Sequence, residues 1–233
     1  MLFTSAPRSP DESAELAQVI DAACSGLSGV RIAQALLEPH ESRAESAFWL
    51  ASFLRIGRLS YMRRPVPRPG EVCESGEAAW PAGVNVRNVR KGDDEALRTA
   101  LDRTYENTLD CPELCGLRDT RDVLDSHRAT GRFDPNLWWI VHRFEQPEGA
   151  MLLNPCPEQG TIELVYLGLS PALRRCGLGA RLLALGLSRI AGRNERHVTC
   201  AVDERNEPAR RLYRRAGFSE FAIRIAMVRR IPG

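Results

Sequence analysis

The chain has 233 residues, of which 43% are hydrophobic and 27% charged, and its formal net charge at pH 7 is +2. These values are typical of a globular protein with an apolar core, and they give no sign of a surface built to bind nucleic acid. No stretch approaches the roughly 18 uninterrupted apolar residues of a membrane-spanning helix, and the N-terminus lacks a signal-peptide pattern, so we expect a cytoplasmic protein.

The cysteines number seven, an odd count, and no paired spacing recurs among them. We therefore expect reduced thiols, with neither a disulfide framework nor a metal site.

The first 64 residues predict a small unit of two helices and two strands. The expected elements are a helix at 11–24, a strand at 30–36, a helix at 43–51 and a strand at 56–62. The next stretch opens with Pro65, Pro67 and Pro69, which disfavour both a helix and a central strand. We therefore expect an N-terminal αβαβ unit over residues 1–64, a linker over 65–83 and a main domain over 84–233.

The main domain predicts strands that first pair locally and then alternate with helices. Its expected strands are 84–89, 137–144, 150–154, 161–169, 197–202 and 221–228, with a turn at 146–149 between the second and third. Its expected helices are 93–107, 119–130, 177–191 and 207–216, with a loop over 110–118. This order predicts an α/β (α+β) fold with a mixed sheet.

The N-terminal unit repeats the helix, strand, helix, strand order that ends the main domain. A gapless comparison places Phe48 on Tyr213, Ala51 on Ala216, Phe53 on Phe218 and Met62 on Met227, with Ser52 where Gly217 stands. We therefore predict a degenerate internal duplication. Nothing before Val30 resembles the glycine-containing segment described next, so we expect one active site per chain.

The segment Arg174-Arg175-Cys176-Gly177-Leu178-Gly179-Ala180 joins an apolar strand to a leucine-rich helix. A helix N-terminus leaves backbone N–H groups unpaired, and the two glycines remove side chains that would keep a phosphate away from them. No Gly-Lys-Ser/Thr follows, which excludes a Walker loop, and Leu182 replaces the third glycine of the dinucleotide fingerprint. A tight turn whose glycines serve the backbone alone remains an alternative.

A second motif follows at the expected distance and contains Asn206, Ala209, Leu212-Tyr213 and Gly217-Phe218. Together the two segments resemble the GCN5-related N-acetyltransferase (GNAT) superfamily, whose signature Gln/Arg-x-x-Gly-x-Gly/Ala is matched by residues 174–179. The resemblance is firm over 161–229 and looser over 84–154. It implies a mixed, mostly antiparallel sheet with a splayed strand pair flanked by helices. With the N-terminal half-repeat, it also implies a tandem, one-and-a-half-domain member.

The resemblance implies acetyl-CoA or another acyl-CoA as cosubstrate and no metal. The backbone of 167–169 would pair with the pantetheine arm as an added strand, and the amides of 175–180 would hold the pyrophosphate. The implied cofactor-binding residues are Leu167, Gly168, Leu169, Arg174, Arg175, Cys176, Gly177, Leu178, Gly179, Ala180 and Asn206.

Two residues are the catalytic candidates. The resemblance makes Tyr213 the general acid that protonates the departing thiolate, although a core tyrosine would show the same pattern. Glu163 resembles the family's strand glutamate and is the candidate base, although a solvated glutamate at a strand end remains the alternative. Strand alternation predicts that Glu163 shares a face with Val165, Leu167 and Leu169.

The loop at 110–118 falls where the family places its acceptor-binding loop. Acids in or beside it, Glu106, Asp110, Glu113 and Asp119, could attract a cationic amine, but acids at the surface are usually solvated.

We expect an acyl-CoA-dependent N-acyltransferase that moves an acetyl group to a primary amine of a small molecule or peptide by direct attack. One alternative is a CoA-binding sensor or regulatory module of the same fold without turnover. The other is a nucleotide-binding or purely structural α/β protein. We expect no nucleic-acid or membrane partner, and a homodimer remains open.

Overall fold

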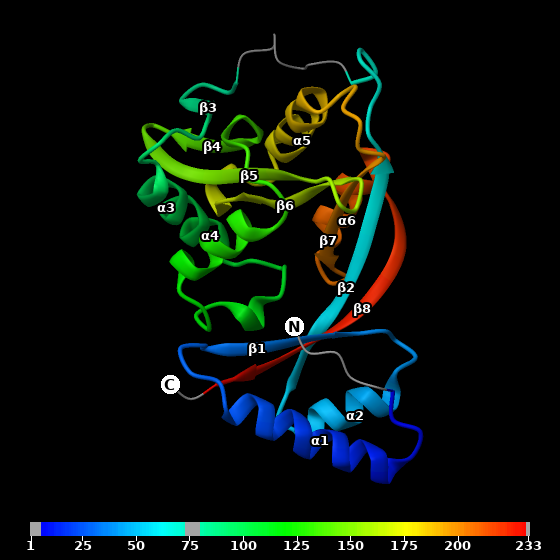
Figure 1. Cartoon of the computed structure of the whole chain (residues 1–233). Helices are drawn as coiled ribbons and strands as arrows, with labels where there is room; N and C mark the ends of the chain where they lie inside the picture. The colour runs from blue at the N-terminus through cyan, green and yellow to red at the C-terminus, as the bar shows by residue number, and fades with distance from the viewer. Residues whose placement is uncertain (1–5, 73–79, 232–233) are drawn as a thin grey trace.

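The computed structural model describes residues 6–72 and 80–231. Its described strands form one eight-stranded sheet in the order β1-β8-β2-β7-β6-β5-β4-β3, with helices on both faces (Figure 1). Cys73 and most of the second half of the predicted linker lie outside the described residues.

The strands are β1 (Ile32–Leu37), β2 (Leu54–Pro65), β3 (Val84–Asn88), β4 (Trp138–Arg143), β5 (Gln146–Cys156), β6 (Thr161–Leu169), β7 (His197–Asp203) and β8 (Ser219–Arg230). The α-helices are α1 (Pro10–Ser25), α2 (Ser42–Leu50), α3 (Asp94–Tyr105), α4 (Thr120–Ala129), α5 (Leu178–Arg189) and α6 (Glu207–Arg215). Short 3-10 helices cover Pro112–Leu114, Pro135–Leu137 and Pro171–Leu173.

The predicted fold class is confirmed, because the sheet is mixed and mostly antiparallel. Among its pairs, β6 with β7 is parallel and the others are antiparallel. Buried side chains place α3 against β4 and β5 on one face, whereas α5 and α6 cover β6 and β7 on the other. A separate apolar cluster joins α1 and α2 to β1 and β8.

The predicted turn at 146–149 is wrong. The strands β4 and β5 are joined at Phe144 and Glu145, whose φ angles are 45° and 67°. Two residues with positive φ form a tight hairpin turn that follows the natural twist of the strands. Pro147 and Gly149, the residues that suggested the turn, lie within β5.

The two long strands β2 and β8 join the region around α1 and α2 to the rest of the sheet (Figure 1). In the sheet, β2 lies between β7 and β8, so a strand of the predicted N-terminal unit sits between strands of the predicted main domain. The division at 65–83 remains a prediction about the chain's organisation.

The pairing of these strands repeats along the chain. Ala35 of β1 faces Met227 of β8, and Cys200 of β7 faces Met62 of β2. The shift that takes Ala35 to Cys200 also takes Met62 to Met227, and the same shift relates every pair of the β1·β8 ladder to a pair of the β2·β7 ladder. In the central pair β2·β8, Leu59 faces Arg224, and the pairing on either side of them is symmetric. This regularity supports the predicted duplication.

The turn after each of the two corresponding helices is also repeated. Ser52 has φ 64° and Gly217 has φ 84°, so both residues are left-handed. The aromatic pairs around them correspond as well: the ring centroids of Phe48 and Phe53 lie 5.0 Å apart, and those of Tyr213 and Phe218 lie 5.7 Å apart. Ser52, which differs from Gly217 in the sequence comparison, therefore adopts the same backbone conformation as Gly217.

The predicted splayed strand pair is confirmed in β6 and β7. They pair only from Thr161 to Glu163, opposite His197 to Thr199. Beyond this point β6 continues along β5, whereas β7 continues along β2. The two strands thus leave free backbone edges facing each other.

Candidate active site

The separation of β6 from β7 opens a cavity of about 1090 Å³. Its wall includes the C-terminal half of β6, the start of α5, one side of α6 and the segment after α3. Among the predicted site residues, those in the wall are Leu167, Gly168, Leu169, Arg174, Arg175, Gly177, Leu178, Gly179, Ala180, Asn206 and Tyr213. Cys176 and Glu163 are predicted site residues outside this wall. The structure thus gathers most of the predicted residues around one space.

The start of α5 has the features of an anion-binding loop. Gly177 has φ 77°, and a Cβ built on it would meet no atom within 4 Å, because it would point into open space. In the described part of the chain, the N–H groups of residues 175–179 donate to no acceptor. Unpaired amides at a helix N-terminus attract phosphate. The geometry therefore suits a pyrophosphate.

The guanidinium of Arg174 is engaged within the protein. Its nitrogens donate to the carbonyl oxygens of Leu169 at 2.9 Å, Asn107 at 3.0 Å and Thr104 at 2.9 Å. Arg174 thereby ties the end of α3 to the start of the loop. This arrangement gives Arg174 a positioning role beside the predicted cofactor contact, while Arg175 is exposed in the cavity wall.

The predicted alternation of β6 is interrupted by a β-bulge. Leu152 and Leu153 of β5 face Tyr166 and Leu164, so Val165 has no partner in β5. An extra residue reverses the faces of the side chains that follow it. Glu163 and Val165 therefore do not share a face with Leu167 and Leu169, which pack against the core under α5. The prediction of one common face is wrong for this reason.

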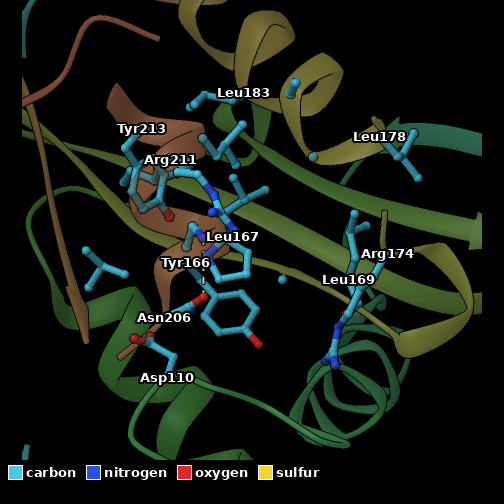
Figure 2. A pocket seen from close by; sticks show the side chains of 18 of the residues that line it. Asp110, Tyr166, Leu167, Leu169, Arg174, Leu178, Leu183, Asn206, Arg211 and Tyr213 are labelled. Atoms are coloured by element: carbon cyan, nitrogen blue, oxygen red, sulfur yellow. Dashed lines mark hydrogen bonds between the residues drawn. The ribbon is translucent and has the colours of Figure 1, made fainter. Parts of the chain in front are cut away.

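Tyr213 lies on α6 with its ring in the core and its hydroxyl at the cavity. The residue is 6% exposed and packs against Phe218. Within residues 6–72 and 80–231, the hydroxyl has no hydrogen-bond partner. Figure 2 shows Tyr213 on the same side of the pocket as Asn206. Burial, followed by the negative charges that Cys200, Asp110 and Tyr166 can carry, raises the pKa of Tyr213 well above that of a free tyrosine. The phenol is therefore protonated at neutral pH.

Glu163 is the last residue of β6 that pairs with β7, at the point where the strands separate. It is half-buried, and desolvation raises the pKa of its carboxyl group. Its charge in turn raises the pKa of Tyr61, after the larger effect of burial, so Tyr61 of β2 lies within its electrostatic reach. Glu163 thus lies beside the cavity and is not part of its wall. Val165, two residues further along β6, does line the cavity.

Asn206 begins α6 and Cys176 lies in the loop. The Oδ1 of Asn206 accepts the N–H of Ala209 at 3.3 Å, which caps the helix and fixes the side chain at the cavity wall. The thiol of Cys176 instead points to the carbonyl of Leu173, with 3.0 Å between sulfur and oxygen.

Sequence reasoning missed two tyrosines, one in the cavity wall and one near Glu163. Tyr166 lines the cavity and its hydroxyl is hydrogen-bonded to that of Thr104 on α3. Burial raises the pKa of Tyr166. Tyr61 lies outside the cavity wall, on β2, within the electrostatic reach of Glu163, and it belongs to the segment predicted to be a separate unit. Tyr166 could have been predicted from its place in the strand 161–169, two residues before Gly168, which was already assigned to the cofactor. No local pattern pointed to Tyr61.

Among the residues that the structure describes, no group of three or more His, Cys, Asp or Glu side chains could hold a metal ion. No helix in the same residues is long and apolar enough to cross a membrane.

Comparison with known proteins agrees with this geometry. The model of the Acetyltransferase (GNAT) family matches residues 101–218. A mycothiol acetyltransferase of Streptomyces bingchenggensis is 31% identical over 163 residues, which cover 70% of this chain and 51% of that protein. One of Thermobispora bispora is 31% identical over 222 residues, which cover 89% of this chain and 67% of that protein.

Among solved structures, a GCN5-related N-acetyltransferase from Sphaerobacter thermophilus superposes with a TM-score of 0.55 at 22% identity, covering 87% of this chain and 61% of that one. At this identity the likeness concerns the fold alone. The chain spans about half the length of several of the curated relatives it matches. The family match, the relatives and the fold agree, and the chain belongs to the GNAT family of acetyltransferases.

Proposed function

We propose that this chain transfers an acetyl group from acetyl-CoA to a primary amine by direct attack. The observation that carries the proposal is the position of Tyr213, whose unpartnered hydroxyl lies in the same cavity as the free amides at the start of α5. A proton donor and a phosphate-binding loop in one cavity are what transfer from CoA requires.

The residues present fit CoA. The open space beside Gly177 and the unpaired amides of 175–179 suit the pyrophosphate. The edge of β6 that turns away from β7 offers the backbone of Leu167 and Leu169 to the pantetheine amides, in the manner of an added strand. When bound, acetyl-CoA supplies the thioester carbonyl that the amine attacks.

The roles of the residues follow from this placement. The N–H of Leu167 is assigned to the carbonyl oxygen, where a backbone donor stabilises the negative charge that develops during attack. Tyr213 is assigned the proton that the sulfur takes as the C–S bond breaks, since its raised pKa keeps that proton in place at neutral pH. Glu163 is assigned a proton from the nitrogen, directly or through water, because desolvation makes its carboxylate more basic.

For the acceptor, the relatives named mycothiol acetyltransferase suggest an amine of the mycothiol type. Other small-molecule or peptide amines remain within the proposal, since loops that bind acceptors vary more than the scaffold that holds them.

The N-terminal segment enters the same proposal. We propose that residues 1–64 are a degenerate GNAT half and that residues 84–233 form the acetyltransferase domain. The repeated ladder registers of β1·β8 and β2·β7 support the duplication. Through Tyr61 on β2, the degenerate half would also stand near Glu163, the proposed base.

Binding of CoA is tested by native mass spectrometry of the purified chain and by thermal shift with added CoA. Gly177→Asp should abolish both signals, because it places a carboxylate where the phosphate would lie. Gly29→Asp is a matched control, since Gly29 also has positive φ and open space around it but lies outside the cavity wall. If both variants lost CoA binding equally, the loss would be due to backbone strain, and the result would count against a phosphate site at Gly177.

Turnover is tested by measuring thiol release from acetyl-CoA with a panel of amines that includes mycothiol lacking its acetyl group. Thiol release that depends on the amine supports the enzyme. Retention of CoA without thiol release for any amine favours the sensor or regulatory alternative. No CoA retention, no thermal shift and no thiol release would favour a nucleotide-binding or structural protein.

A further inference from the structure

A loop carboxylate, Asp110, is held at the end of β7 beside the cavity. It lies in the segment between α3 and α4. Its Oδ1 accepts the backbone N–H of Asp203 at 2.8 Å, and its own N–H donates to the hydroxyl oxygen of Thr108 at 3.1 Å. The first bond ties the carboxylate to the strand whose departure from β6 opens the cavity, and the second braces the backbone of the loop.

The contact between the loop and β7 runs in both directions. The N–H of Cys111 donates to Oδ2 of Asp203 at 3.1 Å, while the backbone N–H of Asp203 donates to Oδ1 of Asp110. Asp203 is fully buried, and Cys111 adopts a left-handed φ of 44°. A residue other than glycine holds such a φ only where its surroundings enforce it, so the loop is docked at this point.

The second oxygen of Asp110 remains available to a ligand. Across residues 6–72 and 80–231, no donor contacts Oδ2, and the side chain forms part of the cavity wall. Figure 2 shows Asp110, Asn206 and Tyr213 along one side of the pocket, with Leu169 and Arg174 on the other. Asp110 thus faces the same space as the proposed acid, from the side opposite the loop that suits the phosphates.

The neighbouring cation does not occupy this carboxylate. Arg205 donates to both oxygens of Asp203, to both oxygens of Glu113 and to the carbonyl of Ile56. The titratable groups that face Asp110 are Cys111 on its own loop, Tyr166 from β6, Cys200 and Asp203 from β7, Arg205 after β7, and Tyr213 from α6. Desolvation raises the pKa of Asp110, although its hydrogen bond from Asp203 opposes the shift.

We propose that Asp110 is the carboxylate that binds the ammonium group of the acceptor and takes its first proton. The assignment rests on the proposed function and adds to it the class of acceptor: a primary amine that arrives as a cation. Anchored through Oδ1, the side chain presents Oδ2 to the ammonium N–H groups as a charge-assisted acceptor.

An ammonium group loses two protons on becoming an amide. The first passes to Asp110 and from there to solvent, which leaves a neutral nitrogen able to attack. The second leaves the nitrogen after the C–N bond forms, by way of Glu163, and restores Tyr213, which has given its own proton to the departing sulfur. One proton is released to solvent in each turnover.

The test compares Asp110→Asn with the unaltered chain, using acetyl-CoA with 2-phenylethylamine, a cation at neutral pH, and with aniline, which is uncharged there. Asparagine keeps an oxygen for the N–H of Asp203 and replaces the free oxygen with an amide, so the loop should stay docked. We expect kcat/KM for 2-phenylethylamine to fall about 100-fold, mainly through KM. The ratio of kcat/KM for aniline to kcat/KM for 2-phenylethylamine should rise, and the thermal shift caused by CoA should be unchanged.

The pH profile provides a second readout. The acid limb of kcat/KM for the cationic amine should reflect both Asp110 and Glu163. Its shape should change in Asp110→Asn, where only Glu163 remains, but be kept in Glu106→Gln, an exposed acid of the same segment that lies outside the cavity wall. Equal activity and profiles in Asp110→Asn and the unaltered chain would overturn the assignment of Asp110 alone. An unaltered chain inactive with every amine of the panel would remove the proposed function and this assignment with it.

Discussion

The hydroxyl of Tyr166 lies where a side chain at Gly168 would begin: a Cβ on Gly168 would stand 2.6 Å from that oxygen and 2.7 Å from the ring. The ring cannot easily move away, because its hydroxyl is bonded to Thr104 and it packs against Tyr105 and His127. The absence of a side chain at Gly168 thus lets one tyrosine brace the strand to which we assign pantetheine binding.

Gly168→Ala should destabilise the protein by about 1–3 kcal/mol, since it overfills a packed site. Urea unfolding checks the change, and weaker binding of CoA should accompany it. Tyr166→Phe removes the atom closest to the new methyl group, so Gly168→Ala should lower the free energy of unfolding by less in Tyr166→Phe than in the unaltered chain. If the two substitutions had purely additive effects on that free energy, the contact would be contradicted.

Tyr213→Phe should lower kcat about 100-fold by removing the proton donor for the thiolate. The hydroxyl has no partner among the described residues, so the free energy of unfolding should change little. Because burial raises the pKa of Tyr213, the unaltered enzyme should show no loss of rate near the ordinary tyrosine pKa of about 10. Steady-state kinetics from neutral to alkaline pH would decide this, and a fall near that pH would argue against Tyr213 as the acid.

Arg174→Ala should lower the free energy of unfolding by about 2 kcal/mol, because three carbonyl oxygens lose a charged donor. Arg174→Lys should restore little of this, since an ammonium lacks the planar fork that reaches all three. Hydrogen exchange at the end of α3 should rise in both variants. Arg175→Ala, one residue on and exposed, should leave that exchange unchanged.

Ser52→Gly should raise the free energy of unfolding by about 0.5 kcal/mol, because glycine adopts φ 64° without the strain of a side chain but loses more entropy on folding. Gly217→Ala, at the corresponding turn, should lower it by about 1 kcal/mol. Thermal unfolding of the two variants gives the sign of each change in the free energy of unfolding. Changes of the same sign in both variants would contradict the correspondence of the two turns.

His127 should make stability depend on pH between about 4 and 6.5. Desolvation lowers the pKa of the folded imidazole to about 4, and its Nε2 is buried without a partner in the described chain. The unfolded chain binds the proton more readily, so stability is full above the unfolded pKa of about 6.5 and is lost as pH falls toward 4. His127→Leu should flatten this part of the stability profile, measured by urea unfolding at several pH values.

The sequence by itself determined most of the elements and the two motifs. Strand 161–169 was predicted to the residue, and the other strands and helices to within a few residues. Their patterns are local: alternation, glycines at turns and caps at helix starts act between residues that are neighbours in the chain. Gly177 and Tyr213 are far apart in the chain, and the resemblance to the GNAT family, rather than a local pattern, predicted one site for both.

Only the tertiary structure decided the rest. The bulge at Val165 depends on which residues of β5 lie opposite β6, and it moved Glu163 away from the face predicted for it. Arg174 donates to Thr104 in the last turn of α3 and to Asn107 just after it, about seventy residues earlier in the chain. In the sequence, Asp110 is one of several acids in and beside a loop. The hydrogen bond from the N–H of Asp203 distinguishes it, because this bond holds its carboxylate at the cavity. These outcomes rest on contacts between distant segments, which a one-dimensional pattern does not encode.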